Sequence, residues 1–182
     1  RSYPTPRLKS CDNGGNISAL RAAIPKGADL MKILDYLSFD TILTDLASAD
    51  KKGVLDELAE PVARQTGLNH REIVRVLIER ERLGSTGIGG GIAIPHGKIA
   101  GLENLVLGFG LSRNGVNFDA LDSRPSYIFF LLLSPDNSTG LHLKVLARIS
   151  KLLKDEDFKQ RLKQAPNPEG VIRIISEVDE DF

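Results

Sequence analysis

The chain has 182 residues, of which 41% are hydrophobic and 26% are charged, so one globular domain with a substantial core is expected. Its 24 basic and 24 acidic residues balance, which argues against nucleic acid or an anionic membrane as the main partner. The longest strongly apolar run, residues 127–133, is far shorter than the roughly 20 residues of a membrane-spanning helix, so we expect a soluble protein without membrane insertion.

The first thirty residues differ from the rest, because prolines and glycines are scattered through them without a helical or strand period. Met31 is the only methionine, and an amphipathic segment follows it directly, as at a translation start. We expect residues 1–30 to be a leader or an expression-derived extension outside the fold, and residues 31–182 to form the domain. The leader contains the only cysteine, Cys11, and does not resemble a secretory signal. A cysteine-free domain fits a reducing cytoplasm.

Two amphipathic helices are predicted next. Residues 51–66 carry an apolar stripe with helical spacing, and Gly67 closes it. The second helix begins with Asn69 as its N-cap and runs towards Gly84.

Several β-prone runs follow these helices. They are residues 92–94, 105–111, 116–118 and 126–133. Asn114-Gly115 favours a turn that would pair the second and third runs as antiparallel strands. Helical periods then return over residues 141–153, 155–163 and 168–175. This order predicts a single-domain α/β fold with a mixed β-sheet flanked by helices.

A glycine-rich run, residues 84–91, separates the second helix from the first β-prone run, and we expect a constrained loop without regular structure there. It matches neither common nucleotide pattern. A Walker loop fails because Ile99 follows Gly97-Lys98, and a dinucleotide fingerprint fails because a helix, not a strand, precedes the glycines. No nucleotide cofactor is therefore expected.

The remaining candidate for chemistry is His96, which follows a short β-prone run. Pro95 fixes its own φ angle, and Gly97 permits a close approach that a side chain would block, so the imidazole is held with restricted freedom. A single loop histidine is more often structural or solvated. The residues alone leave the role of His96 open.

The run from Arg80 to Lys98 resembles the signature of type-2 IIA domains of the phosphoenolpyruvate-dependent phosphotransferase system, most nearly the nitrogen-regulatory kind. The similarity continues through residues 117–122, 131–135 and 141–143 and spans essentially residues 31–177. One departure is Gly90, where the nitrogen-regulatory kind usually has asparagine. The resemblance implies the fructose/mannitol-type IIA fold.

The resemblance also implies site residues, with His96 as phosphoryl acceptor and His142 and Arg80 beside it. An unprotonated imidazole nitrogen can attack phosphorus, Arg80 can neutralise the transferred group, and His142 can donate to it or tune the pKa of His96. Alternatively, Arg80 belongs to a solvated charge cluster and His142 is a helix-start residue. The expected phosphate-binding residues are Ser85, Thr86, Gly87, Gly89, Gly91 and Gly97.

The implied activity is that of a cytoplasmic phosphoryl carrier with a regulatory role. Its donor would be a phosphorylated HPr-like protein, and its phosphorylation state would be read by downstream regulatory proteins. An alternative is a fructose- or mannitol-specific IIA component that passes phosphate to a IIB domain, although no IIB-like or membrane segment follows in this sequence. A non-catalytic interaction module is a further alternative. Metal binding by the histidines lacks a recognised ligand spacing, so neither a metal nor a cofactor is expected.

Overall fold

The computed structural model describes residues 32–179. The proposed leader, residues 1–30, lies outside the described residues. In chain order the elements are η2 (Ile33–Asp35), β1 (Leu37–Leu43), α1 (Lys51–Thr66), α2 (His70–Arg82), β2 (Gly87–Gly89), β3 (Ile92–Ala93), β4 (His96–Lys98), β5 (Val106–Val116), β6 (Ser126–Ser134), α3 (Thr139–Leu152), α4 (Glu156–Gln164) and α5 (Pro168–Ser176).

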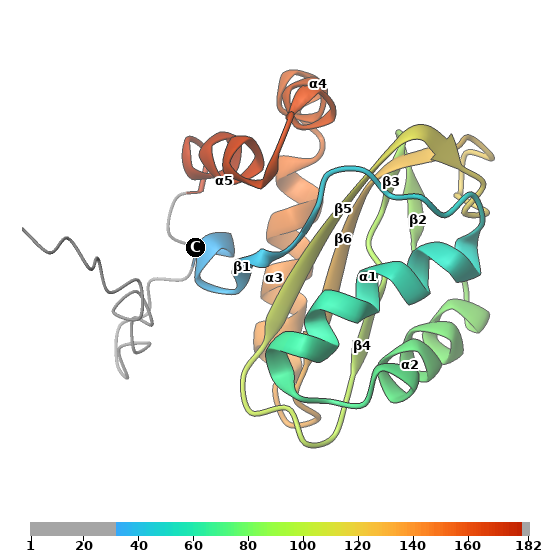
Figure 1. Cartoon of the computed structure of the whole chain (residues 1–182), viewed down its shortest axis with the longest axis vertical. Coiled ribbons are helices and arrows are strands. Elements are labelled where there is room, and N and C mark those ends of the chain that lie inside the picture. Colours follow the sequence, from blue (N-terminus) through green and yellow to red (C-terminus); the bar gives the residue numbers. More distant parts are fainter. Residues whose placement is uncertain (1–31, 180–182) are drawn as a thin grey trace, which may run out of the picture.

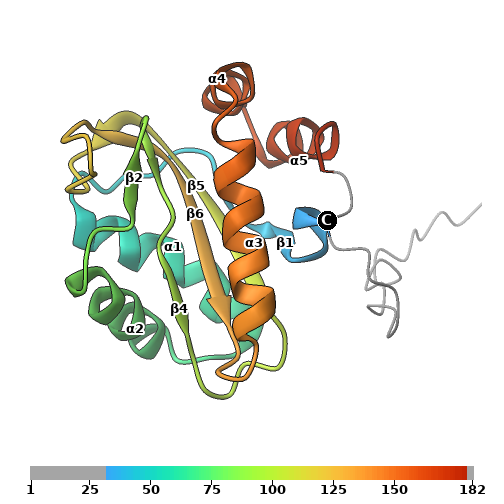
Figure 2. The same cartoon turned by 180° about the vertical axis from the view of Figure 1, so that it is seen from behind.

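The described elements form three layers, with a mixed six-stranded sheet between helices. Helices α1 and α2 cover one face (Figure 1), and the view from behind shows α3 across the other (Figure 2). The strand order is β1-β5-β6-β3-β2, and β4 also pairs with β6. Strand β6 is antiparallel to β5 on one side and parallel to β3 and β4 on the other. The prediction of a mixed sheet flanked by helices is therefore confirmed.

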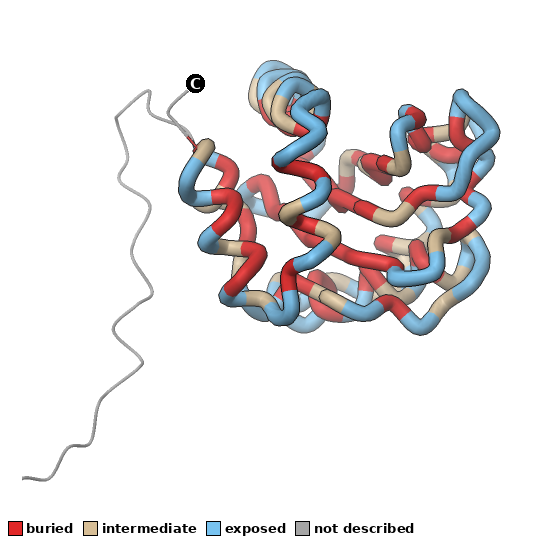
Figure 3. Tube along the Cα trace, turned by 90° about the horizontal axis from the view of Figure 1, so that it is seen from above, coloured by how far each residue is buried: buried red, intermediate tan, exposed pale blue. Residues whose placement is uncertain are grey.

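Strand β6 divides the hydrophobic core into two clusters, because its side chains alternate between the two faces. Ile128, Phe130 and Leu132 belong to the cluster that includes α3, α4 and α5. Their neighbours at 129, 131 and 133 belong to the cluster under α1 and α2. Buried residues accordingly run along the central strands, between exposed outer turns (Figure 3). A continuous apolar run in the sequence thus corresponds to a strand covered on both faces.

The two predicted N-terminal helices have the expected ends. The side chain of Asn69 accepts hydrogen bonds from the backbone N–H groups of Arg71 and Glu72, as an N-cap does. Gly67 ends α1 in a left-handed conformation with φ of 74°. Both helices are therefore positioned by signals that are local in the sequence.

The glycine-rich run is not wholly irregular, and the prediction of a loop over residues 84–91 is wrong in part. Gly87–Gly89 forms β2, which pairs antiparallel with β3. Glycine is needed in this strand, because a Cβ on Gly87 would lie 2.9 Å from the Cα of Ala120. The absent side chain lets a neighbouring segment lie directly against the strand.

The predicted hairpin at Asn114-Gly115 is also wrong. Strand β5 continues through these residues to Val116. Leu111 pairs with Ile128 and Val116 with Ser126, so the residues between them form a bulge. The chain does not reverse at this point.

Among the described residues, no helix is both long enough and apolar enough to cross a membrane.

Candidate active site

His96 is the first residue of β4, which pairs with the C-terminal end of β6. His96 is in register with Leu132 and therefore lies on the α3 side of the sheet. Gly97 is in register with Leu133, whose cluster lies under α1 and α2. Among the described strands β4 pairs only with β6, so the other edge of β4 is not covered by a strand. Residues from α2 and α3 can therefore both reach His96.

The hydrogen bonds of His96 fix which ring nitrogen carries its proton. Nδ1 lies 2.8 Å from the carbonyl oxygen of Ile94, which can only accept, so Nδ1 is the donor. Nε2 lies 3.1 Å from Nε of Arg80, which can only donate. Burial lowers the pKa of His96, the bond to Ile94 opposes that shift, and the positive charge of Arg80 adds to it. The ring is therefore neutral at pH 7, with its lone pair on Nε2.

Arg80 reaches His96 from the last turn of α2. Besides the bond from Nε, its Nη1 donates to the carbonyl of Gly84 at 3.0 Å. The helix packs closely on β4 because Gly97 has no side chain. A Cβ there would lie 2.5 Å from Cγ1 of Val76, one helical turn before Arg80. The prediction of a close approach at Gly97 is confirmed, and the approaching group is α2.

His142 reaches the same place from the first turn of α3. Its ring centroid lies 5.4 Å from that of His96, with an angle of 61° between the planes. The residue is only 6% exposed, and its Nδ1 lies 2.6 Å from Oγ of Ser134. Burial is the main cause that lowers the pKa of His142 to about 4, and the positive charges of Lys98, Arg80 and, when it is protonated, His96 add to the shift. His142 is therefore a neutral imidazole beside His96.

The structure does not bring the three consecutive glycines at 89–91 to His96. Gly91 accepts from the backbone N–H of Ile128, whereas His96 pairs with Leu132. Four residues of strand separate these positions, or roughly 13 Å at about 3.3 Å per residue. The N–H of Gly90 also already donates to the carboxylate of Asp122 at 2.9 Å.

The predicted phosphate-binding hydroxyls and Gly87 are engaged within the protein. The Oγ of Ser85 donates to the carbonyl of Phe118 and accepts from the N–H of Gly87. The Oγ1 of Thr86 donates to the buried carboxylate of Glu81 at 2.5 Å, and its N–H donates to the same group. A direct role in phosphate binding for Ser85, Thr86, Gly87, Gly89 and Gly91 stays a prediction without geometric support.

Four residues near the site were given no role by the sequence. Glu81 anchors Thr86, and Lys51 pairs with this carboxylate at 3.0 Å. Ser134 contacts His142, and Lys98, on the same face of β4 as His96, donates to Oγ1 of Thr139 at 2.5 Å. These contacts join residues from different elements, and no sequence signal pointed to them.

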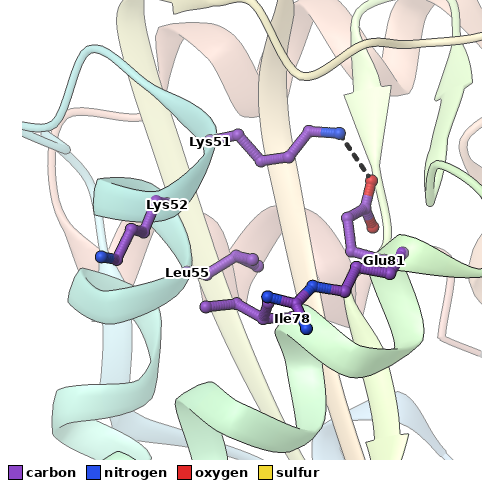
Figure 4. A pocket seen from close by; sticks show the side chains of 6 residues that line it. Lys51, Lys52, Leu55, Ile78 and Glu81 are labelled. Atoms are coloured by element: carbon purple, nitrogen blue, oxygen red, sulfur yellow. Dashed lines mark hydrogen bonds and ion pairs between the residues drawn. The ribbon is translucent and has the colours of Figure 1, made fainter.

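A hollow between α1 and α2 does not include the histidines. Its lining residues are Lys51, Lys52, Leu55, Ile78, Glu81 and Arg82 (Figure 4). Within residues 32–179, no group of three or more histidine, cysteine, aspartate or glutamate residues is placed to hold a metal ion. The site itself brings together the imidazoles of His96 and His142 and the guanidinium of Arg80.

A neutral imidazole with an unprotonated ring nitrogen beside a guanidinium suits the transfer of an anionic group. Comparison with known proteins identifies the group concerned. The family described as phosphoenolpyruvate-dependent sugar phosphotransferase system, EIIA 2, matches residues 35–178. The chain belongs to this family. EIIA domains are the phosphotransferase components that carry a phosphohistidine.

Relatives of this EIIA domain include regulatory and sugar-specific proteins. The nitrogen regulatory protein of Bradyrhizobium diazoefficiens is 38% identical over 146 residues, which cover 80% of this chain and 95% of the relative. The fructose-specific EIIABC component of Bacillus subtilis is 36% identical over 150 residues, 82% of this chain but 24% of that protein.

Solved structures agree with this assignment. The crystal structure of the nitrogen regulatory protein IIA-Ntr from Neisseria meningitidis has a TM-score of 0.74 at 35% identity and covers 78% of this chain and 97% of its own. The IIA mannitol structure from Escherichia coli, at 20% identity, has a TM-score of 0.65, covers 76% of this chain and 97% of its own, and supports the fold alone. The resemblance seen in the sequence is confirmed.

Proposed function

We propose that this EIIA domain accepts a phosphoryl group on Nε2 of His96. The observation that carries the proposal is the hydrogen bond from Nδ1 to the carbonyl of Ile94, because it leaves the lone pair on the opposite nitrogen. The lowered pKa of His96 supports the same role, since a neutral ring needs no separate base before it attacks phosphorus.

The transfer step balances without a proton transfer at His96. Nε2 gives its lone pair to phosphorus while the bond from phosphorus to the donor's nitrogen breaks and its electron pair stays on the donor. Nδ1 keeps its proton, and the phosphorylated ring gains positive character. The carbonyl of Ile94, 2.8 Å from Nδ1, stabilises that charge throughout.

Arg80 has two roles in this scheme. Before transfer its Nε–H bonds Nε2 and favours the reactive tautomer. That bond is lost when the lone pair bonds phosphorus, and the guanidinium then donates to the phosphoryl oxygens, where its charge offsets theirs. Gly97 assists by allowing α2 to pack against β4.

The proposed donor is a phosphorylated HPr-like carrier protein in the cytoplasm. Two large apolar side chains near the site suit brief protein docking: Leu83 follows the last turn of α2 and is 86% exposed, and Leu143 follows His142 and is 60% exposed. A small, patchy interface of this kind fits a transient encounter.

A regulatory role is proposed for the phosphorylation state, with downstream regulatory proteins as its readers. The support is the similarity to nitrogen regulatory proteins over nearly their whole length. The fructose-specific relative supports a second candidate, in which the phosphoryl group passes to a IIB domain. Incubation of the phosphorylated protein with a purified fructose IIB domain separates the two: rapid loss of the label favours the sugar pathway, and retention favours regulation.

Labelling from a phosphorylated HPr-like carrier tests the acceptor. The wild type should gain an acid-labile phosphate, and His96→Ala should gain none. His70→Ala is the matched control, because this histidine bonds the carbonyl of Asp56 at the surface between α1 and α2 and should not affect labelling. Equal labelling of His96→Ala and wild type would overturn the proposal.

A further inference from the structure

Ser134 is buried at the point where β6 ends and the chain turns towards α3. The residue is 0% exposed, and its backbone carbonyl accepts from the N–H of Ile99 at 3.0 Å. It is in register with Lys98 of β4, two residues after His96. The position of its hydroxyl is therefore fixed by the same strand pair that presents His96.

The short contact between Oγ of Ser134 and Nδ1 of His142 has one direction that satisfies both groups. At 2.6 Å it is a hydrogen bond, and either atom could be its donor. A buried hydroxyl proton without an acceptor is costly, and Oγ has no other hydrogen-bond partner among the described residues. The hydroxyl therefore donates, and Nδ1 of His142 accepts.

This direction determines the tautomer of His142. Because the ring is neutral at pH 7 and its Nδ1 accepts, the single proton is on Nε2. Nε2 lies on the ring edge away from Ser134 and has no hydrogen-bond partner within residues 32–179. With the two rings edge to face at 5.4 Å, a phosphoryl group on His96 would provide the missing acceptor.

We infer that Ser134 is a positioning residue. Its hydroxyl holds the proton of His142 on Nε2, so that this N–H can donate a hydrogen bond to the phosphoryl group on His96. The inference rests on the proposed function of His96. The benefit is preorganisation: the N–H donor of His142 is in place before the phosphoryl group arrives, in a site where a hydrogen bond to an anion is stronger than in water.

The same strand offers a matched control. Ser126 begins β6, is also 0% exposed, and its Oγ has no hydrogen-bond partner among the described residues. Ser134→Ala and Ser126→Ala therefore remove the same atom at the same burial from one strand. Only the first removes a contact with His142. Ser134→Thr retains the hydroxyl and serves as the rescue variant.

The first readout is the tautomer of His142, measured from ¹⁵N chemical shifts of the ring at pH 7. The wild type and Ser126→Ala should show the proton on Nε2. Ser134→Ala should show a mixture or the Nδ1–H form, and Ser134→Thr should restore the wild-type pattern. A wild-type protein with its proton on Nδ1 of His142 would overturn the inference even if Ser134→Ala did not fold.

The second readout is phosphorylation by phosphoramidate, in which Nε2 of His96 bonds phosphorus and ammonia leaves with the electron pair of the broken bond. Ser134→Ala should react about tenfold more slowly, the effect of one hydrogen bond to a charged group. An unchanged rate, or an equal loss in Ser126→Ala, refutes the role of Ser134. Failure of the proposed function is a separate result: in that case His96→Ala would react as fast as the wild type.

Discussion

Nε of Arg80 lies 3.1 Å from Nε2 of His96, although the two residues are sixteen positions apart in the chain, with two short strands between them. The contact is made by the nitrogen that we propose as the acceptor. In the proposed reaction, Arg80 therefore lies where the phosphoryl group arrives, and it exchanges one hydrogen-bond acceptor for another during transfer.

Replacement of Arg80 should therefore slow labelling more than it destabilises the protein. Hydrogen bonds to charged groups are worth roughly 1.5–3 kcal/mol, so Arg80→Ala should reduce the labelling rate by about tenfold to hundredfold. Arg80→Lys should recover only part of this, because an ammonium lacks the planar donor fork. Labelling time courses measure both. Arg75→Ala, on the exposed side of the same helix, is the control, and an equal loss there would contradict a specific role for Arg80.

The pKa of His142 predicts a pH dependence of stability. The ring titrates near pH 6.5 when unfolded and at about 4 when folded. As pH falls through this window the unfolded chain binds the proton first, so stability is lost as pH falls, by about 3 kcal/mol in total for this group. Urea unfolding at pH 7 and pH 4 should show a smaller loss for His142→Gln than for the wild type. Carboxylates that titrate in the same pH window affect both proteins equally, so their contribution cancels when the two losses are compared. An equal loss of stability in wild type and His142→Gln would contradict the prediction.

Gly97→Ala should destabilise the protein, because the added side chain would disturb the packing of α2 against β4. A Cβ 2.5 Å from Cγ1 of Val76 overpacks the contact, at a cost of about 2 kcal/mol. Val76→Ala in the same protein should relieve most of that cost, which a double-mutant cycle of urea unfolding measures. Additive effects of the two substitutions would show that the close approach is not what Gly97 provides.

Glu81→Gln should destabilise the protein through Thr86. The buried carboxylate accepts the N–H and hydroxyl of Thr86 and pairs with the partly exposed ammonium of Lys51. Loss of the Glu81 charge should lower the free energy of unfolding by about 2 kcal/mol, less than for a pair in which both groups are fully buried. Glu79→Gln, exposed on α2, should change it by less than about 0.5 kcal/mol. The prediction fails if the two variants unfold at the same urea concentration.

The helices were predictable from the sequence because their signals are local. Asn69 and Gly67 act within one turn of the helix ends that they define. Strand β1 gave no such signal, since its burial pattern is irregular and it is held by parallel pairing with β5, more than sixty residues later. The same is true of β2, whose glycines suggest a loop until its pairing with β3 is known.

Some residues of the site could be predicted from the sequence, and others could not. The resemblance identified His96, Arg80 and His142, and the structure brings these three together. It could not identify Ser134, because the contact with His142 depends on how the end of β6 meets the first turn of α3. Neither could spacing show that Ser85 and Thr86 bond within the protein. Phe118 is 33 residues from Ser85, and the contact between Thr86 and Glu81, five residues apart, depends on the path of the chain after α2.

Because His96 lies on β4, the site is complete only when the helices on both faces of the sheet are packed. Arg80 comes with the helical layer on one face of the sheet, and His142 with the layer on the other. A chain in which only one layer has docked holds the imidazole with half of its partners. Under the proposed function, a folding intermediate of that kind would be a poor acceptor, so only molecules whose two hydrophobic clusters are both formed would be phosphorylated efficiently.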